Sequence, residues 1–370
     1  MIDSDASAYL FISLLQARAG KSFMSRLGDV TFAEVPGMSA TELSERVRMS
    51  DQTVRAFEEL RRTFDPAAVI HDLQQRGISV VTLADGEYPE RLKVVPDPPP
   101  VLFVDGELPP PETPAVALVG SRKASVSGLD TARSLGRALG ERGVCVVSGL
   151  ALGIDAAAHE GTLETGGLTV GVLGCGIDVV YPRSNRRLFQ QVRESGALVS
   201  EYHLAEAPLA WRFPARNRII AGLCQSVVVV EAAEKSGALI TARHALDAGA
   251  DVWAVPGPPG PPECRGSNRL IADGAGCLWD IPEFVDSVAP EITGPVPAED
   301  ARIDASVPAG LPEGEAAALT GVGFEPTPVD TVAGRSGLRM QELLSALALL
   351  ELKGYVSRDG SGSFVRRSGG

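Results

Sequence analysis

The segment Ala115-Val-Ala-Leu-Val-Gly-Ser-Arg-Lys-Ala-Ser125 decides the fold class of this 370-residue chain. Its first five residues are continuously apolar, which is typical of a strand buried on both faces of a parallel sheet. Gly120 ends the run, and the stretch Val126–Arg142 has the periodicity of an amphipathic helix. A buried strand, a glycine turn and a helix make one unit of a doubly wound α/β sheet.

The same alternation extends over residues 76–286. Short apolar runs are separated by crossovers of a dozen or more residues, the length that parallel pairing requires. The predicted strands are Ile78–Leu83, Ala115–Val119, Val144–Val147, Thr169–Leu173, Ala197–Ser200, Ser226–Glu231 and Asp251–Val255. The predicted helices include Val126–Arg142, Ile154–Glu164, Asn185–Ser195 and Ala238–Ala248. We therefore predict a doubly wound parallel sheet, whose ligands bind beyond the carboxyl ends of its strands.

Residues 1–75 predict a separate helical domain. Its helical stretches are Ala8–Ala17, Ser22–Leu27, Ala40–Val47 and Asp51–Thr63. Between them, Val35-Pro-Gly-Met38 is compatible with the hairpin of a helix-hairpin-helix or SAM-like module, where a glycine lets backbone amides approach a phosphate. The second glycine of such a hairpin is missing, so a plain turn is the alternative.

The chain after the sheet divides into a linker and a small domain. Residues 287–312 are rich in Pro, Ala and acidic side chains, which predicts an extended, self-repelling linker. Residues 313–370 regain apolar periodicity, and the order helix, helix, helix, hairpin is a winged-helix outline. The predicted elements are Glu313–Thr320, Val329–Ala333, Arg339–Lys353, Tyr355–Arg358 and Ser363–Arg366.

The charge of the chain is unevenly distributed. An evenly spread net charge of −13 would argue against a nucleic-acid partner. Between Ile281 and Asp330, however, ten acidic residues stand against a single arginine, so most of the excess lies in this segment. The remainder of the chain is close enough to neutral to hold a local basic groove.

Cysteine usage and hydropathy indicate a cytoplasmic protein with no membrane partner. Five cysteines, an odd number without a C-x-x-C pair, favour free buried thiols in a reducing compartment. The acidic start and the apolar stretch Ala8–Leu15 lack the basic flank of a signal peptide, and no apolar run is long enough to span a bilayer.

The first candidate site follows the strand Ala115–Val119. Gly120 and Ser121 lead into a helix N-terminus, which is the arrangement of an anion cradle, and Arg122 and Lys123 add positive charge. The alternative is a structural tight turn. Neither the dinucleotide fingerprint G-x-G-x-x-G nor a P-loop G-K-[ST] is present, so we expect no nucleotide cofactor.

The next strand ends in Ser148-Gly149 rather than in the acid that would hold a ribose. A hydroxyl and a glycine at the same edge make both residues further candidates for the binding site. Asp155 and His159, one helical turn apart, share a helix face and have the chemistry of metal ligands. No third ligand follows at a matching spacing, so a structural pair is favoured and we expect no metal site.

Two further segments complete the candidate site. Ala215–Gly222, with Phe213 just upstream, places Arg216, Asn217 and Arg218 at a helix start without a nearby acid, which suits phosphate pairing and base stacking. After the strand Ser226–Glu231, a second cradle is formed by Lys235, Ser236, Gly237 and Thr241. Several anion sites at one sheet edge indicate several phosphates in a row.

These segments resemble the DprA (Smf) family of bacterial DNA-processing proteins. The matching stretches are Val119–Ser125, Val147–His159, Val180–Pro182, Phe213–Gly222, Ser236–Arg243, Ala254–Gly257 and Asn268–Ala275. The N-terminal helices are similar to the SAM-like domain of that family, and the C-terminal residues to its winged helix. Two positions depart from its pattern: Cys224 replaces a small hydroxyl residue, and Asp251 stands where a basic residue is common.

The resemblance implies a Rossmann-like fold that binds single-stranded DNA without catalysing a reaction, protects it, forms a homodimer and loads the recombinase RecA during natural transformation. Carried over to this chain, the groove would use Gly120, Ser121, Arg122, Phe213, Arg216, Asn217 and Arg218, lined further by Lys235, Ser236 and Gly237.

The alternative is a nucleotide-hydrolysing enzyme of the lysine-decarboxylase-like group. Its Pro-Gly-Gly-x-Gly-Thr-x-x-Glu loop has only Pro256-Gly-Pro-Pro-Gly260 as a counterpart here, without the threonine or the glutamate. For the winged helix, two roles stay open: duplex binding through Arg335, Arg339, Arg358, Arg366 and Arg367, or protein contact through its aliphatic helix.

Overall fold

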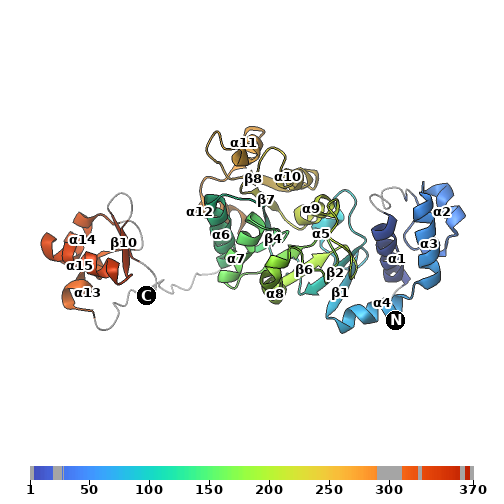
Figure 1. The fold of residues 1–370 in the computed structure, drawn as a ribbon, viewed down its shortest axis with the longest axis horizontal. Coiled ribbons are helices and arrows are strands. Elements are labelled where there is room, and N and C mark those ends of the chain that lie inside the picture. The colour runs from blue at the N-terminus through green and yellow to red at the C-terminus, as the bar shows by residue number, and fades with distance from the viewer. Residues whose placement is uncertain are drawn as a thin grey trace. The chain divides into compact units, whose positions relative to one another are not determined.

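The computed structural model describes residues 4–19, 27, 29–289, 311–323, 327–358 and 363–366. The chain forms two compact units, residues 1–291 and residues 292–370 (Figure 1). Each unit has its own apolar core and is described by itself. The finer predicted boundaries at residues 75, 286 and 312 stay predictions. Among the described residues, no helix has both the length and the apolar character needed to cross a membrane.

A mixed sheet organises the first unit. Within the described residues its nine strands are β1 (Ile78–Thr82), β2 (Val101–Gly106), β3 (Ala115–Val119), β4 (Cys145–Ser148), β5 (Thr169–Val172), β6 (Gly196–Ser200), β7 (Ser226–Val229), β8 (Asp251–Ala254) and β9 (Gly276–Cys277). Their order in space is β1-β2-β6-β5-β4-β3-β7-β8-β9. From β6 to β9 all neighbours pair parallel, which confirms the predicted parallel sheet.

The edge formed by β1 and β2 differs from the prediction. β1 pairs antiparallel with β2, and β2 pairs antiparallel with β6. The strand Ile78–Leu83 was therefore wrongly assigned to the parallel set. β2 was missed because prolines flank it on both sides, at 98–100 and 109–111, and so obscure the apolar run between them.

Helices cover both faces of the parallel strands because alternate residues of each strand point to opposite sides. Val116 and Leu118 of β3 pack against one group of helices, and Ala117 and Val119 lie in the other core. The first group contains α6 (Val126–Glu141), α7 (Ile154–Glu164) and α12 (Ile281–Val288). The second contains α5 (Glu90–Lys93), α9 (Arg212–Gly222) and α10 (Ala238–Asp247). The remaining sheet helices are α8 (Arg186–Glu194) and α11 (Arg265–Ala272).

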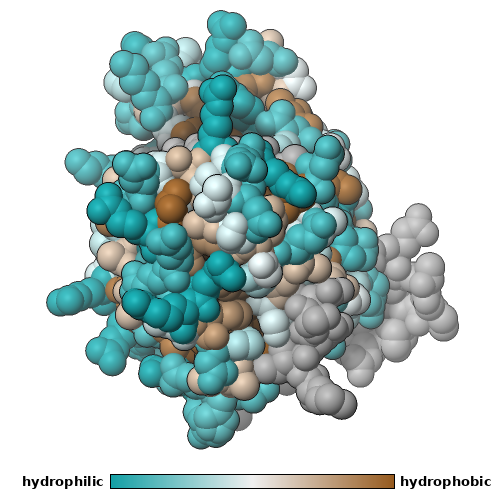
Figure 2. Space-filling model, turned by 90° about the vertical axis from the view of Figure 1, so that its right-hand side faces the viewer, coloured by the Kyte–Doolittle hydropathy of each residue, from teal (hydrophilic) through white to brown (hydrophobic). Residues whose placement is uncertain are grey.

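The N-terminal residues form α1 (Ser4–Ala19), α2 (Ala40–Arg46), α3 (Asp51–Thr63) and α4 (Pro66–Gln75) (Figure 1). The first three helices share a core of their own, whereas Leu73 of α4 packs in the core that contains Ile78 of β1 and Phe103 of β2. Ser39 and Glu42 build a capping box at α2, and Ser50 caps α3. The segment Val35–Gly37 is a single 3-10 turn. The predicted helix Ser22–Leu27 lies outside the described residues except for Leu27. Figure 2 shows a mostly hydrophilic surface, with smaller apolar areas between the hydrophilic side chains, on the side that faces the viewer.

The second unit contains α13 (Glu313–Gly321), α14 (Val329–Ser336), α15 (Met340–Leu352), and the antiparallel pair β10 (Val356–Arg358) and β11 (Phe364–Arg366). Leu343, Leu347 and Leu350 of α15 are fully buried against the other elements. Three helices followed by a two-stranded wing confirm the predicted winged helix. α15 also leaves Met340, Leu344 and Leu349 exposed.

The backbones of α6 and α7 lie so close together at Gly161 that an added methyl group tests this contact. A Cβ atom on Gly161 of α7 would lie 2.1 Å from the carbonyl oxygen of Arg133, a backbone atom that cannot rotate away. We predict that Gly161→Ala lowers the free energy of unfolding by about 1–3 kcal/mol through overpacking. Urea unfolding followed by tryptophan fluorescence reports on this unit, because Trp211, Trp253 and Trp279 all belong to it.

Gly86→Ala is the matched control, since nothing lies within 4 Å of a Cβ at this glycine. Equal stability of the two variants would contradict the close helix contact.

Candidate functional site

The candidate site lies where the strand order of the sheet reverses. From β3 the chain proceeds outward through β4, β5 and β6, whereas β7 lies on the other side of β3 and continues to β8. The loops after β3 and β7 therefore separate at the carboxyl edge and leave a crevice, the usual ligand position in such sheets. Ser121 N donates to Glu231 O across this crevice at 2.7 Å, which ties the two loops together.

A groove of about 510 Å³ occupies this position. It unites segments that are far apart in sequence: the loop after β3, the start of α9, and the loop between β7 and α10. The predicted site residues that line it are Gly120, Ser121, Arg122, Lys123, Phe213, Arg216, Asn217, Lys235, Ser236, Gly237 and Thr241. Ala151, Asp155 and Pro214 also line it, although the prediction did not include them.

The groove is basic although the chain is acidic. Arg122, Lys123 and Lys235 are exposed to solvent, and Arg216 forms part of the wall. Asp155 is the one acidic residue in the lining, and its carboxylate is committed to the amides of Gly149 and Ala151. Burial raises the pKa of this carboxyl. The groove therefore favours an anionic ligand.

Arg216 fixes the wall of the groove instead of reaching into it. The side chain is 3% exposed, and its Nη1 donates to the carbonyl oxygens of Gly149, at 2.9 Å, and Val172. A Cβ atom at Gly149 would lie 2.4 Å from Nη2, so only glycine allows this approach. Burial lowers the pKa of Arg216 to about 10, so it stays charged at neutral pH.

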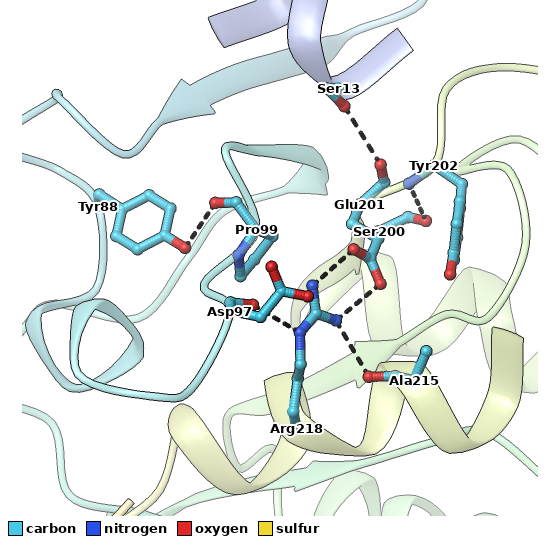
Figure 3. A network of polar contacts seen from close by, with 9 residues as sticks. All are labelled: Ser13, Tyr88, Asp97, Pro99, Ser200, Glu201, Tyr202, Ala215 and Arg218. Carbon is cyan, nitrogen blue, oxygen red and sulfur yellow. Dashed lines mark hydrogen bonds and ion pairs between the residues drawn. The ribbon is translucent and has the colours of Figure 1, made fainter. Parts of the chain in front are cut away.

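Arg218 does not belong to the groove, contrary to our expectation (Figure 3). Its guanidinium forms a two-pronged ion pair with Glu201, both contacts at 2.8 Å, and Nε donates to Asp97 O. Arg218 and Glu201 are 6% and 7% exposed. Arg218 directly follows Asn217 on α9, but its side chain lines a different hollow, together with Asp97 and Glu201, and is absent from the lining of the groove. Arg212 likewise pairs with Glu206 and stacks on Tyr202.

Ser148 is also removed from the predicted set. The residue is fully buried, and its hydroxyl donates to the carbonyl oxygen of Leu118 in the neighbouring strand. Gly149 contributes through its carbonyl, which holds Arg216, and not as an open anion cradle. Ser148 and Gly149 therefore stabilise the wall of the groove and do not contact a ligand themselves.

The N-terminus of α6 already has an anionic partner. The Ser125 hydroxyl accepts from Gly128 N and donates to the carboxylate of Glu231, which also accepts from Ser125 N. Since Glu231 is 4% exposed and sits where a nucleotide phosphate would bind, the predicted cradle is occupied by the protein itself. What remains for a ligand is the outer part of the loop, Ser121 to Lys123.

The loop before α10 is held by α9. Asn217 Nδ2 donates to Gly237 O at 3.2 Å, and the Ser236 hydroxyl accepts from Ala238 N. These contacts set the direction of the loop and leave the Lys235 side chain exposed at the rim. Asn217 therefore positions Lys235 and Ser236.

Phe213 lines the groove in contact with a second aromatic ring. Its ring lies 5.4 Å from that of Tyr181, tilted by 37°, and the Arg122 guanidinium lies 5.3 Å from the Phe213 centroid. Tyr181 and the nearby Leu152 are 44% and 47% exposed. The prediction omitted both, although the Tyr181-Pro182 dipeptide after a strand end was a signal that pointed to the first.

Asp155 and His159 form structural contacts. His159 is fully buried, and Thr169 Oγ1 donates to Val146 O, so the 2.7 Å contact with His159 uses the proton on Nδ1 of the imidazole. Nε2 is buried without a partner. Across the described ranges, no group of three or more His, Cys, Asp or Glu side chains has a metal-binding arrangement.

The cysteines are free, as predicted, but not all are buried: Cys277 in β9 is exposed. Burial raises the pKa of Cys145 to about 12 and that of Cys175 to about 11, so these two thiols are inert at neutral pH.

The buried ion pair of Arg218 and Glu201 predicts a strongly non-additive response to mutation. Arg218→Met leaves the Glu201 carboxylate buried and unpaired, so the free energy of unfolding should fall by about 3–5 kcal/mol. The double variant Arg218→Met/Glu201→Gln removes both charges and should recover a large part of this loss. Urea titrations of the two single variants and the double variant measure the coupling; additive effects would contradict a direct pair.

His159 predicts a loss of stability in acid. Burial lowers the pKa of His159 to about 3, so the unfolded chain binds this proton first. The neutral imidazole therefore contributes its full share to the free energy of unfolding above about pH 6.5. Below that pH the free energy of unfolding falls, by about 2 kcal/mol at pH 5. His159→Gln should flatten the decline between pH 6.5 and 4, whereas the exposed His71→Gln should not. Parallel curves for all three proteins would show that His159 is protonated in the folded state.

Comparison with known proteins identifies relatives of the whole chain. The family model described as DNA recombination-mediator protein A matches residues 79–289, and the DprA winged helix domain model matches residues 304–362. A putative DNA processing protein DprA of Mycobacterium tuberculosis is 34% identical over 390 residues, covering 100% of this chain and 97% of the relative. Protein Smf of Escherichia coli is 42% identical over 294 residues, 76% of each chain.

Solved structures agree with this assignment. DprA of Streptococcus pneumoniae superposes with a TM-score of 0.61 at 33% identity, over 76% of this chain and 98% of that one. DprA of Helicobacter pylori, whose structure is described as showing a single-stranded DNA binding mode, superposes with a TM-score of 0.52 at 29% identity. This match covers 57% of the present chain and 94% of the H. pylori chain. Together with the family match over more than half of its length, these relatives show that the chain belongs to the DprA (Smf) family of DNA recombination-mediator proteins.

Proposed function

We propose that this chain binds single-stranded DNA in the groove at the carboxyl edge of its sheet. The observation that carries the proposal is the convergence of Arg122, Lys123 and Lys235, all exposed, on one groove in a protein of net charge −13. Cations spaced along a groove and flanked by an aromatic ring suit a sugar–phosphate chain with unpaired bases.

The proposed contacts divide into three roles. Phosphates would pair with Arg122, Lys123 and Lys235 and accept from the hydroxyls of Ser121 and Ser236, whereas Thr241 is buried and would form part of the groove wall. Phe213 would offer its ring to a base. Gly120, Gly149, Arg216, Asn217 and Gly237 would shape the groove, as their contacts with backbone carbonyls and neighbouring loops support. The single-stranded DNA described for the H. pylori relative supports the same ligand class.

We propose a binding role without catalysis. In the lining, Asp155 is the single carboxylate, and it is occupied by two amides; Glu231 is held by Ser125. A hydrolase of the lysine-decarboxylase-like group needs an exposed carboxylate beside the bond that it cleaves. Incubation with nucleoside monophosphates should release no free base; release that disappears in Asp155→Asn would favour the enzyme.

Membership in the family supports a wider role: protection of incoming single strands and their transfer to RecA during natural transformation, by a homodimer. The winged helix would contact protein. Exposed Met340, Leu344 and Leu349 on α15, and the pairing of Arg339 with Glu342, favour this role over a duplex-binding face.

Replacement of Arg122 tests the proposal. Arg122→Ala should weaken binding of oligo-dT and reduce the slope of log K against log salt by about 0.7, because one phosphate contact is lost. Fluorescence anisotropy over a salt series measures both quantities. Arg76→Ala is the control, since Arg76 on the distant α4 is exposed and paired with Asp72. Binding in this groove would be refuted if the binding constant did not change with salt concentration, or if Arg122→Ala left the slope of log K against log salt unchanged.

A further inference from the structure

A second hollow adjoins the groove on the far side of Phe213. It measures about 70 Å³, and the residues that line it include Arg122, Ala151, Leu152, Tyr181, Phe213 and Arg216. Arg122, Ala151, Phe213 and Arg216 also line the main groove, so the two spaces are neighbours. A ligand that passes Phe213 therefore meets Tyr181 next.

Tyr181 is presented by a firmly anchored loop. Asn185 Nδ2 donates to the carbonyls of Leu150 and Ala151, at 3.0 and 3.4 Å, and Cys175 Sγ contacts Val179 O. The two bonds of Asn185 join this segment to the loop after β4, and the contact of Cys175 with Val179 lies within the loop after β5 itself. The ring is thus held at the rim with 44% of the residue exposed.

Tyr181 and Phe213 are already in contact with one another. A centroid separation of 5.4 Å leaves no room for a base between the two rings. A base that enters this hollow would therefore stack on the outer face of Tyr181. Leu152, 47% exposed and lining the same hollow, supplies an apolar edge beside that face.

We propose that Tyr181 is a base-stacking residue and that, with Leu152, it forms a second nucleobase subsite beyond Phe213. The inference rests on the proposed function, because the occupant is a base of the strand held in the main groove. Arg122 lies between both spaces and would hold the phosphate that links the two bases. Duplex DNA is excluded from this subsite, since its bases are stacked on each other.

The test compares a base-bearing and an abasic ligand. We measure the affinity of the full chain for oligo-dT and for an abasic oligonucleotide of the same length, at one salt concentration. Tyr181→Ala should weaken oligo-dT binding by about 5- to 150-fold, the range that follows from about 1–3 kcal/mol per stacked base. Its affinity for the abasic strand should not change, and Tyr181→Phe should bind both ligands as the unaltered protein does.

Two further variants complete the design. Leu168→Ala is the matched control: Leu168 is an exposed apolar residue directly before β5, at the opposite end of the strand that leads to Tyr181, and its loss should affect neither ligand. Tyr181→Trp should show fluorescence quenching with oligo-dT and none with the abasic strand.

The outcomes separate this inference from the proposed function. If the unaltered protein binds neither ligand, the proposed function fails. If it binds oligo-dT but Tyr181→Ala binds equally well, or loses affinity for both ligands alike, the stacking subsite is overturned while the groove remains.

Discussion

The site depends on one constraint, the position of the buried Arg216 guanidinium. It donates hydrogen bonds to the carbonyl oxygens of Gly149 and Val172. They attach α9 to the ends of β4 and β5, and Arg218 attaches the same helix to Glu201 at the end of β6. A helix bound at these points has a fixed orientation. Its opening residues therefore face the crevice between β3 and β7, where Phe213 and Asn217 become part of the groove wall.

The fold separates structural charges from charges that are free for a ligand. The Arg216 guanidinium is held by two backbone carbonyls and that of Arg218 by Glu201, and the Glu231 carboxylate occupies the N-terminus of α6, where a helix can bind a phosphate. The exposed cations come instead from loops, Arg122 and Lys235 among them. A row of flexible cations along an open groove suits a chain of phosphates better than one tightly enclosed nucleotide.

Local sequence patterns predicted the parallel strands, the winged helix and most of the groove lining, because a buried strand followed by glycine leaves a visible signature. They could not predict the partner of each arginine. Glu201, which forms the ion pair with Arg218, is seventeen positions earlier, at the end of another strand. Only the folded sheet brings the two residues together. For Tyr181 the Tyr181-Pro182 dipeptide was a local signal, but only the folded structure shows that its ring contacts Phe213.

A crystal structure of the chain with bound oligo-dT tests the central claim most directly. The account predicts phosphates within hydrogen-bond distance of Arg122 and Lys235, with the strand running along the carboxyl edge of the sheet and Arg218 still paired with Glu201. A strand bound elsewhere, on the winged helix or at the amino edge of the sheet, would contradict it.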